Sequence, residues 1–191
     1  MNFNGLSIEQ APPISAPLRF YLTAPLFAII AGFLILFSDT TVLMSRYSID
    51  SIIITHALTI GFLSFIMLGS LSQMLPVLAG VVIPKVDVVT KASHGLLVLG
   101  TVFMLLGLSY DNSLFNTISI LGLGTGFLII IGVISIAIAK VQNFTATVKA
   151  MATSLFFVFF IVLMGLFLLY SYIDDSYAYL RPLIANIHSV W

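Results

Sequence analysis

The sequence predicts an all-α membrane protein, a polytopic helical bundle of five full transmembrane helices plus the start of a sixth. Of its 191 residues, 60% are hydrophobic and only 7% are charged, whereas an ordinary soluble domain has about 25% charged residues. The hydrophobic residues form uncharged runs, and about 20 such residues in a helix cross the roughly 30 Å hydrocarbon core of a bilayer. Short polar segments separate the runs, which favours antiparallel neighbours in one bundle.

Five of the runs are long enough to cross a bilayer. The predicted spans cover residues 20–38, 51–76, 92–110, 114–139 and 150–173, with a partial span at 182–191. Pro76 lies in the second run, so we expect this helix to kink or end there and residues 77–84 to lie at the interface. Residues 1–18 lack the features of a signal peptide and are predicted to form a short soluble leader before a single transmembrane domain at 19–191.

The placement of basic residues predicts a cytoplasmic N-terminus, because Lys and Arg are enriched in loops that stay in the cytoplasm. The side of the N-terminus holds Arg19, Lys85, Lys91, Lys140 and Lys149, and the other side holds Arg46 and Arg181. We refer to these two sides as the inner and the outer side.

Composition excludes several classes of function. The chain has no cysteine, so disulfides, iron–sulfur clusters and thiolate metal sites are absent. Seven basic residues balance seven acidic ones, which leaves no basic surface for nucleic acid and makes the lipid bilayer the first expected partner. The glycine-rich stretch 122–126 lies in an apolar run, where the spacing of Gly122 and Gly126 favours close packing of two helices over a phosphate-binding loop.

Three histidines are the ionisable residues predicted inside the membrane, and such residues are functional candidates by default. At about 1.5 Å per residue, His56 and His188 lie about 8 and 10 Å along helices that start on the outer side, so they can share a depth. His94 enters from the inner side and is too far from His56 to bind the same iron. Each histidine is either a metal or haem ligand or an interhelical hydrogen-bond donor.

An apolar stripe follows His56 along the second span and offers a wall suited to a macrocycle. It consists of Ile60, Leu63, Met67, Leu71 and Met74.

The second span also carries a motif. His56 begins the stretch His-Ala-Leu-Thr-Ile-Gly-Phe and is followed by Gly69, Pro76 and Gly80. This pattern resembles helix two of the haem–copper oxidase catalytic subunit (subunit I), a superfamily that includes the nitric-oxide reductases. The start of the first span, residues 17–27, is similar to that of the NnrS-like membrane haem proteins. The resemblance covers helices one and two and points to the N-terminal half of such a protein.

The resemblance implies a role in respiratory electron transfer or nitric-oxide metabolism in the inner membrane of a bacterium. It makes His56 the axial ligand of a b-type haem and His188 the ligand of a second metal, either copper or non-haem iron, and His94 remains a further metal candidate. The later helices of the family are not present, so we expect an N-terminal fragment that ends in mid-helix at Trp191. Only a full-length relative would be an oxidoreductase, and we assign no catalytic residue here. A homodimer would supply the second axial ligand of the haem, which the family carries on its later helices. A haem-bearing or respiratory partner subunit is a further expected partner.

Two other functions remain open. The chain can be a small non-enzymatic bundle that assists assembly of a respiratory complex, with its histidines acting only as hydrogen-bond donors. A transporter is the second alternative, but inverted repeats and carboxylates within the spans, which are typical of transporters, are not found in the sequence.

Overall fold

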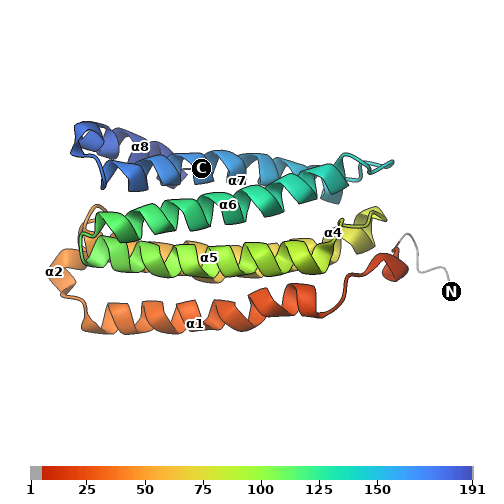
Figure 1. Cartoon of the computed structure of the whole chain (residues 1–191), viewed down its shortest axis with the longest axis horizontal. Helices are drawn as coiled ribbons and strands as arrows, with labels where there is room; N and C mark the ends of the chain where they lie inside the picture. The colour runs from red at the N-terminus through yellow and green to blue at the C-terminus, as the bar shows by residue number, and fades with distance from the viewer. Residues whose placement is uncertain (1–5, 191) are drawn as a thin grey trace.

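The computed structural model describes residues 6–190 and shows a helical bundle (Figure 1). No strand occurs in this part of the chain. The elements in order are η1 (Ile8–Gln10), α1 (Ser15–Phe37), α2 (Thr40–Leu43), α3 (Ile49–His56), the π-helical segment η2 (Ala57–Ser64), α4 (Phe65–Ala79), α5 (Val86–Ser109), α6 (Ser113–Ile138), α7 (Ala146–Ser171), η3 (Asp175–Leu180) and α8 (Arg181–Val190).

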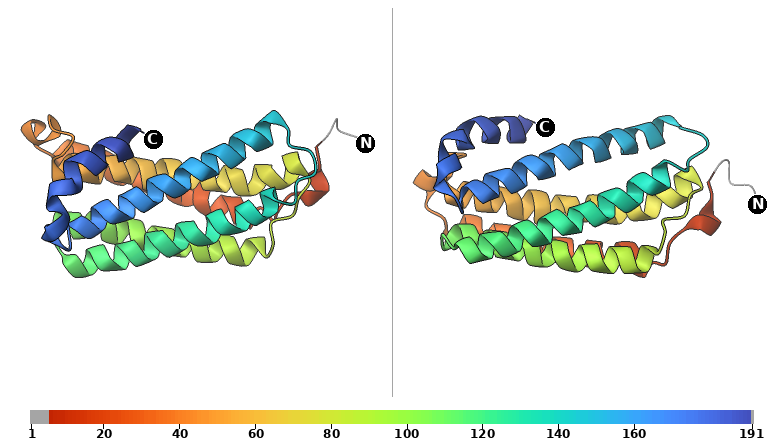
Figure 2. Two further views of the ribbon diagram at one scale, coloured as in Figure 1. Left: turned by 90° about the horizontal axis from the view of Figure 1, so that it is seen from above. Right: turned by 45° about the horizontal axis from the view of Figure 1, so that its top comes forward.

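Five helical units of the described chain are long and apolar enough to cross a membrane, with α3, η2 and α4 forming one continuous span. This confirms the predicted fold class, a polytopic helical membrane protein. The five spans run along the long axis of the molecule, and α2, η3 and the start of α8 gather at the end opposite the N-terminus (Figures 1 and 2). The shorter α8 runs back alongside α7 from that end (Figure 2).

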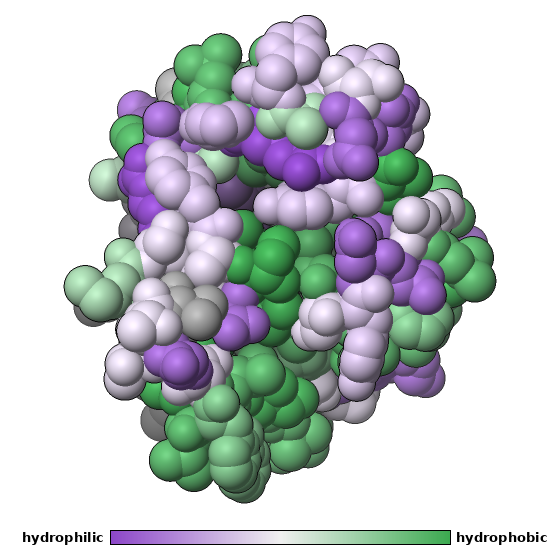
Figure 3. Space-filling view, turned by 90° about the vertical axis from the view of Figure 1, so that its left-hand side faces the viewer, coloured by the Kyte–Doolittle hydropathy of each residue, from purple (hydrophilic) through white to green (hydrophobic). Residues whose placement is uncertain are grey.

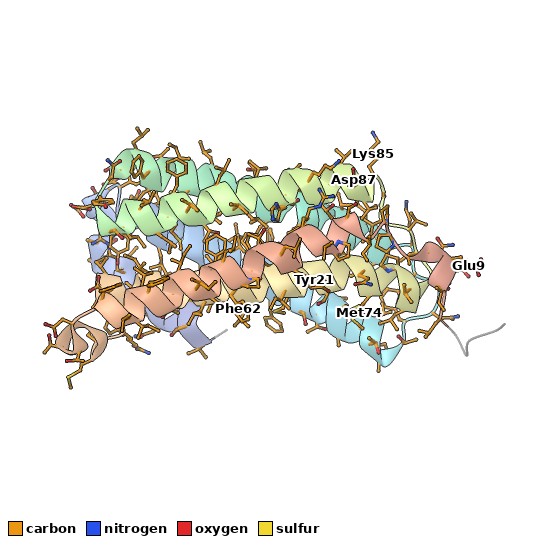
Figure 4. The ribbon with its side chains drawn as sticks, turned by 90° about the horizontal axis from the view of Figure 1, so that it is seen from below. Glu9, Tyr21, Phe62, Met74, Lys85 and Asp87 are labelled. Atoms are coloured by element: carbon orange, nitrogen blue, oxygen red, sulfur yellow. The ribbon has the colours of Figure 1, made fainter. Side chains whose placement is uncertain are left out.

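On the inner side, two helices begin before the predicted spans, because polar residues there continue the helices. α1 begins at Ser15, inside the predicted leader of residues 1–18, of which residues 1–5 lie outside the described part. α5 begins at Val86, inside a segment predicted as a loop. Asp87 in its first turn suits the positive end of the helix dipole, and its carboxylate lies 2.7 Å from both Arg19 and Lys91. Figure 4 shows Lys85 and Asp87 close together near this end.

Pro76 does not end its helix. The helix continues through it to Ala79, three residues beyond the predicted end. Gly80 then adopts a left-handed conformation with φ of 65°, and its N–H donates to the Pro76 carbonyl at 2.9 Å. Glycine is the usual residue in such a helix-ending position because it has no Cβ. Residues 77–79 are therefore helical, and the connection to α5 is shorter than expected.

Close packing between helices forms the core of the bundle. At Gly122, an added Cβ would lie 2.9 Å from the Cα of Gly100, and at Gly126 it would lie 2.9 Å from Leu97 Cγ. The glycine spacing read from the sequence therefore marks the close contact of α5 and α6, as predicted. On the other side of the bundle, the rings of Phe20 and Phe65 pack edge to face with centroids 5.8 Å apart.

Candidate functional site

A cavity of about 530 Å³ lies at the outer end of the bundle, between α3, α5, α7 and α8. On this end of the molecule, hydrophilic residues lie above and beside a recessed hydrophobic centre, and hydrophobic residues continue below it (Figure 3). The lining residues are Tyr47, Ile49, Ile52, His56, Met104, Leu108, Gly165, Leu168, Leu169, Tyr172, Ala178, Arg181, Pro182, Ala185 and His188. Cavities of this size and mostly apolar lining, with a few polar groups, are typical of small-molecule and cofactor sites.

His56, the last residue of α3, lines the cavity, and one of its ring nitrogens is hydrogen-bonded within its own helix. Its Nδ1 lies 2.7 Å from the carbonyl oxygen of Ile52, one turn earlier in the same helix. A carbonyl only accepts hydrogen bonds, so Nδ1 carries the proton and Nε2 keeps its lone pair. This is the arrangement in which a backbone carbonyl orients a histidine for metal binding through its other nitrogen.

His188 on α8 lies beside His56, as the predicted common depth suggested. The two imidazole rings are parallel to within 8°, and their centroids are 6.1 Å apart. Nδ1 of His188 is buried and has no hydrogen-bond partner among the described residues. Gly165 on α7 makes room for this ring, since a Cβ at that position would lie 3.1 Å from Cε1 of His188.

The π-helical segment directly after His56 changes the register of the span. In a π-helix the hydrogen bonds connect residues five apart, and such segments are frequent at functional sites. The side chain of Ser64 also reaches back five residues, to the Thr59 carbonyl at 2.9 Å. Residues beyond the segment therefore point in other directions than a regular helix predicts.

The predicted apolar wall beside His56 is consequently wrong. Leu63, Met67 and Met74 are 48–57% exposed on the surface of the described bundle, and no member of the stripe lines the cavity. Figure 4 shows Met74 away from the centre of the bundle. The actual wall beside the histidine comes from its own helix and from two others, through residues such as Ile52 of α3, Met104 of α5 and Leu168 of α7.

Arg181 and Tyr172 form part of the polar rim at the outer mouth of the cavity. The Arg181 guanidinium donates to Ser171 Oγ at 3.0 Å, to the Ser171 carbonyl and to Asp175 at 2.8 Å. It also lies 4.3 Å from the centre of the Tyr172 ring. Burial raises the pKa of the Tyr172 hydroxyl, and the positive charge of Arg181 partly opposes this shift. Tyr172 is therefore a neutral phenol at physiological pH.

Several lining residues were not identified from the sequence as parts of a site, although some carried a signal. Gly165 is the single glycine of α7, in a run otherwise rich in Phe and Leu. Arg181 begins the last apolar run. Tyr47, Tyr172 and Met104 carried no specific signal, because tyrosine is common at membrane interfaces and methionine is common in apolar helices.

His94 lies apart from this cavity, as expected, and has different surroundings. Its Nε2 lies 2.8 Å from Thr23 Oγ1. The Thr23 hydroxyl donates its one hydrogen to the Arg19 carbonyl at 2.9 Å, so it must accept from His94. The imidazole also packs edge to face on Phe20 and Phe65, with centroids 5.2 and 5.6 Å away. His94 thus links α5 to α1 and packs against aromatic side chains of α1 and α4.

The donor set of the outer cavity limits what it can bind. Within residues 6–190, no group of three or more His, Asp or Glu side chains is placed to hold a metal ion. Structural and catalytic zinc sites need at least three protein ligands. The cavity offers two imidazoles, so a bound metal would need most of its ligands from elsewhere.

Fold and composition thus define the class, a polytopic helical membrane protein with a polar-rimmed cavity at one end. Comparisons with protein-family models, curated proteins and solved structures gave no match for this chain.

Proposed function

We propose that this chain is a membrane haem protein, with haem b held in the outer cavity by His56 and His188. The observation that carries the proposal is the pair of parallel imidazoles, 6.1 Å apart in one largely apolar cavity. Haem iron has four ligands from its own macrocycle and takes only axial ligands from the protein. Two histidines without a third protein donor match that requirement better than they match a bare metal ion.

Both imidazoles would hold the group from one cavity: their rings are parallel to within 8°, with centroids 6.1 Å apart. The hydrogen bond from His56 Nδ1 to Ile52 leaves Nε2 as the nitrogen available to iron. The orphan Nδ1 of His188 is a buried polar atom that still needs a partner.

This proposal changes one expectation from the sequence. The resemblance made His188 the ligand of a second metal, copper or non-haem iron, separate from the haem of His56. The adjacent positions of the two rings favour one shared group instead, because the described residues supply no further cluster of ligands for a second metal. His94 is proposed to have no ligand role, since it does not line this cavity and its ring packs against Phe20 and Phe65.

The cellular role follows from the chemistry of the group and from the resemblance. Bound haem would supply a one-electron carrier whose potential is set by its axial ligands and by burial. We propose that the protein serves respiratory electron transfer or nitric-oxide metabolism, as the oxidase-like pattern of the second span implies. The protein's own contribution is to orient two imidazoles and to exclude water with the apolar walls of α5 and α7.

The direct test is absorption spectroscopy of the full chain expressed with a haem supply and purified in detergent. We expect a Soret band and the reduced spectrum of a six-coordinate low-spin haem. His56→Ala and His188→Ala should each lose the low-spin spectrum, whereas His94→Ala is the matched control and should keep it.

Absence of a Soret band in the wild-type protein, or a spectrum unchanged by His56→Ala, would contradict the proposal. If this chain binds no haem of its own but co-purifies with a haem-loaded partner, the result would instead favour a role in assembly of a respiratory complex. In that role the histidines only connect helices.

A further inference from the structure

A second cluster of polar contacts lies at the mouth of the cavity and joins the segment before α3 to α8. Tyr47 lines the cavity, and its hydroxyl donates to Asn186 Oδ1 of α8 at 2.7 Å. Nη2 of Arg46 donates to the Tyr47 hydroxyl at 2.7 Å and also to Asn186 Oδ1. The guanidinium lies 4.8 Å from the centre of the Tyr47 ring. Arg46 is thus held next to a residue of the cavity wall, although its side chain is exposed.

The two arginines of this end differ in how their charge is compensated. Arg181 is paired with the carboxylate of Asp175. Arg46 contacts only neutral groups, and no carboxylate of the described residues lies within 4 Å of it. The hydrogen bonds to Tyr47 and Asn186 both come from Nη2, whereas a guanidinium has five N–H donors. A positive charge with further N–H donors therefore lies next to Tyr47, one of the residues that line the cavity.

We infer that Arg46 is an anchoring residue for the carboxylates of the group bound in the cavity. This rests on the proposed function, because haem b has an apolar macrocycle with two propionate carboxylates on one edge. His56 is seven residues beyond Ile49, the first residue of α3, and so lies about 10 Å below the rim. The apolar walls and the two imidazoles inside the cavity suit a ligand with an apolar body. An arginine without a carboxylate partner near the mouth suits an acidic edge of that ligand. Arginine is suited to this task because it forms charge-assisted, bidentate hydrogen bonds with carboxylates.

The test compares two porphyrins that differ only in their carboxylates. Purified full-length apoprotein in detergent micelles is titrated with ferric protoporphyrin IX and with its dimethyl ester, and the dissociation constants are read from the Soret band. In Arg46→Gln we expect about tenfold weaker binding of the diacid and unchanged binding of the ester. Arg46→Lys keeps the charge and should recover part of the loss. Lys140→Gln, which removes an exposed cation at the other end of the bundle, is the matched control.

The outcomes separate this inference from the proposed function. In one outcome, both porphyrins give a low-spin spectrum, and Arg46→Gln weakens the binding of both equally or of neither. This outcome overturns the role of Arg46 and leaves the histidine pair as ligands. Absence of any bound porphyrin in the wild-type protein overturns the proposed function and the anchoring role together. Selective loss of the diacid in Arg46→Gln, with an unchanged low-spin spectrum at saturation, supports the inference, since a merely structural role would affect both porphyrins.

Discussion

Two histidine environments of this bundle contrast with each other. His94 is enclosed by Phe20 and Phe65 and donates its one N–H on Nε2 to a neighbouring helix. His56 uses its Nδ1 on its own helix, and its side chain lines a cavity shared with His188. Both are polar residues inside apolar helices, where an unpaired polar group is costly. The difference shows how to judge whether a histidine within a membrane is a candidate ligand. A free ring nitrogen and the space beside it say more than the depth of the residue in the membrane.

The largest predicted effect concerns the closely packed part of the bundle. In Gly122→Val, the new side chain meets the backbone of Gly100, 2.9 Å from the first added atom, and backbone atoms of a helix do not move aside cheaply. Overpacking typically costs about 1–3 kcal/mol, and we expect about 3 kcal/mol because α5 and α6 must separate. Unfolding in mixed micelles with increasing SDS measures this loss.

A control for this prediction lies on the same helix. Gly132 has no atom of the described structure within 4 Å of an added Cβ, so Gly132→Val should change the free energy of unfolding by less than about 0.5 kcal/mol. Equal losses in the two variants would show that helix propensity, and not the contact between α5 and α6, determines the effect.

The second prediction tests whether His94 is a structural link. Replacing His94 by Leu, or Thr23 by Val, removes one partner of the 2.8 Å hydrogen bond and leaves the other part-buried without it. Each variant should lose about 1–2 kcal/mol of the free energy of unfolding. The coupling energy from the double mutant should be about 0.6 kcal/mol and no more than about 1.7 kcal/mol, the average and the maximum measured for hydrogen bonds between membrane helices.

The same variants distinguish His94 from the outer pair. Haem absorption should be unchanged in His94→Leu. Thr117→Val is the control for loss of a hydroxyl, because Thr117 is exposed and its side chain donates only within its own helix. A coupling energy near zero, or a loss of haem in His94→Leu, would remove the contrast between the two environments.

The sequence predicted the features that follow from counting residues, but not those that depend on rotation about a helix axis. The number of spans, the contact of α5 and α6 at Gly122 and the common depth of His56 and His188 all follow from apolar length and the rise per residue. The wall of the cavity could not be predicted in this way, because the π-helical segment at residues 57–64 changes which side chains share a face.

The ends of the helices were also placed incorrectly for a physical reason. Charged residues such as Asp87 and Lys91 were interpreted as a loop, yet they continue α5 because they pair with each other at 2.7 Å where the helix begins. The pairing of α8 with α7 was not predicted, since it depends on the small volume at Gly165 and on where the chain turns after α7. Haem binding, the orientation in the membrane and the cellular role stay predictions.

The smallest predicted effect is at Gly165, where stability and ligand binding should change in opposite directions. Alanine in place of glycine within a helix is favourable by about 0.5–1 kcal/mol, so Gly165→Ala should unfold no more easily than the wild-type protein. The added Cβ, however, lies 3.1 Å from His188 Cε1 and turns the ring. A side chain held about 30° from its rotamer costs about 0.5–1.5 kcal/mol, which corresponds to a roughly two- to tenfold weaker affinity for haem. Gly132→Ala has the same change in propensity without a neighbour and should leave the affinity unchanged. Equally tight haem binding by Gly165→Ala and Gly132→Ala would show that the position of the His188 ring does not determine affinity. The outer cavity would then be less sensitive to shape than the close contact of α5 and α6.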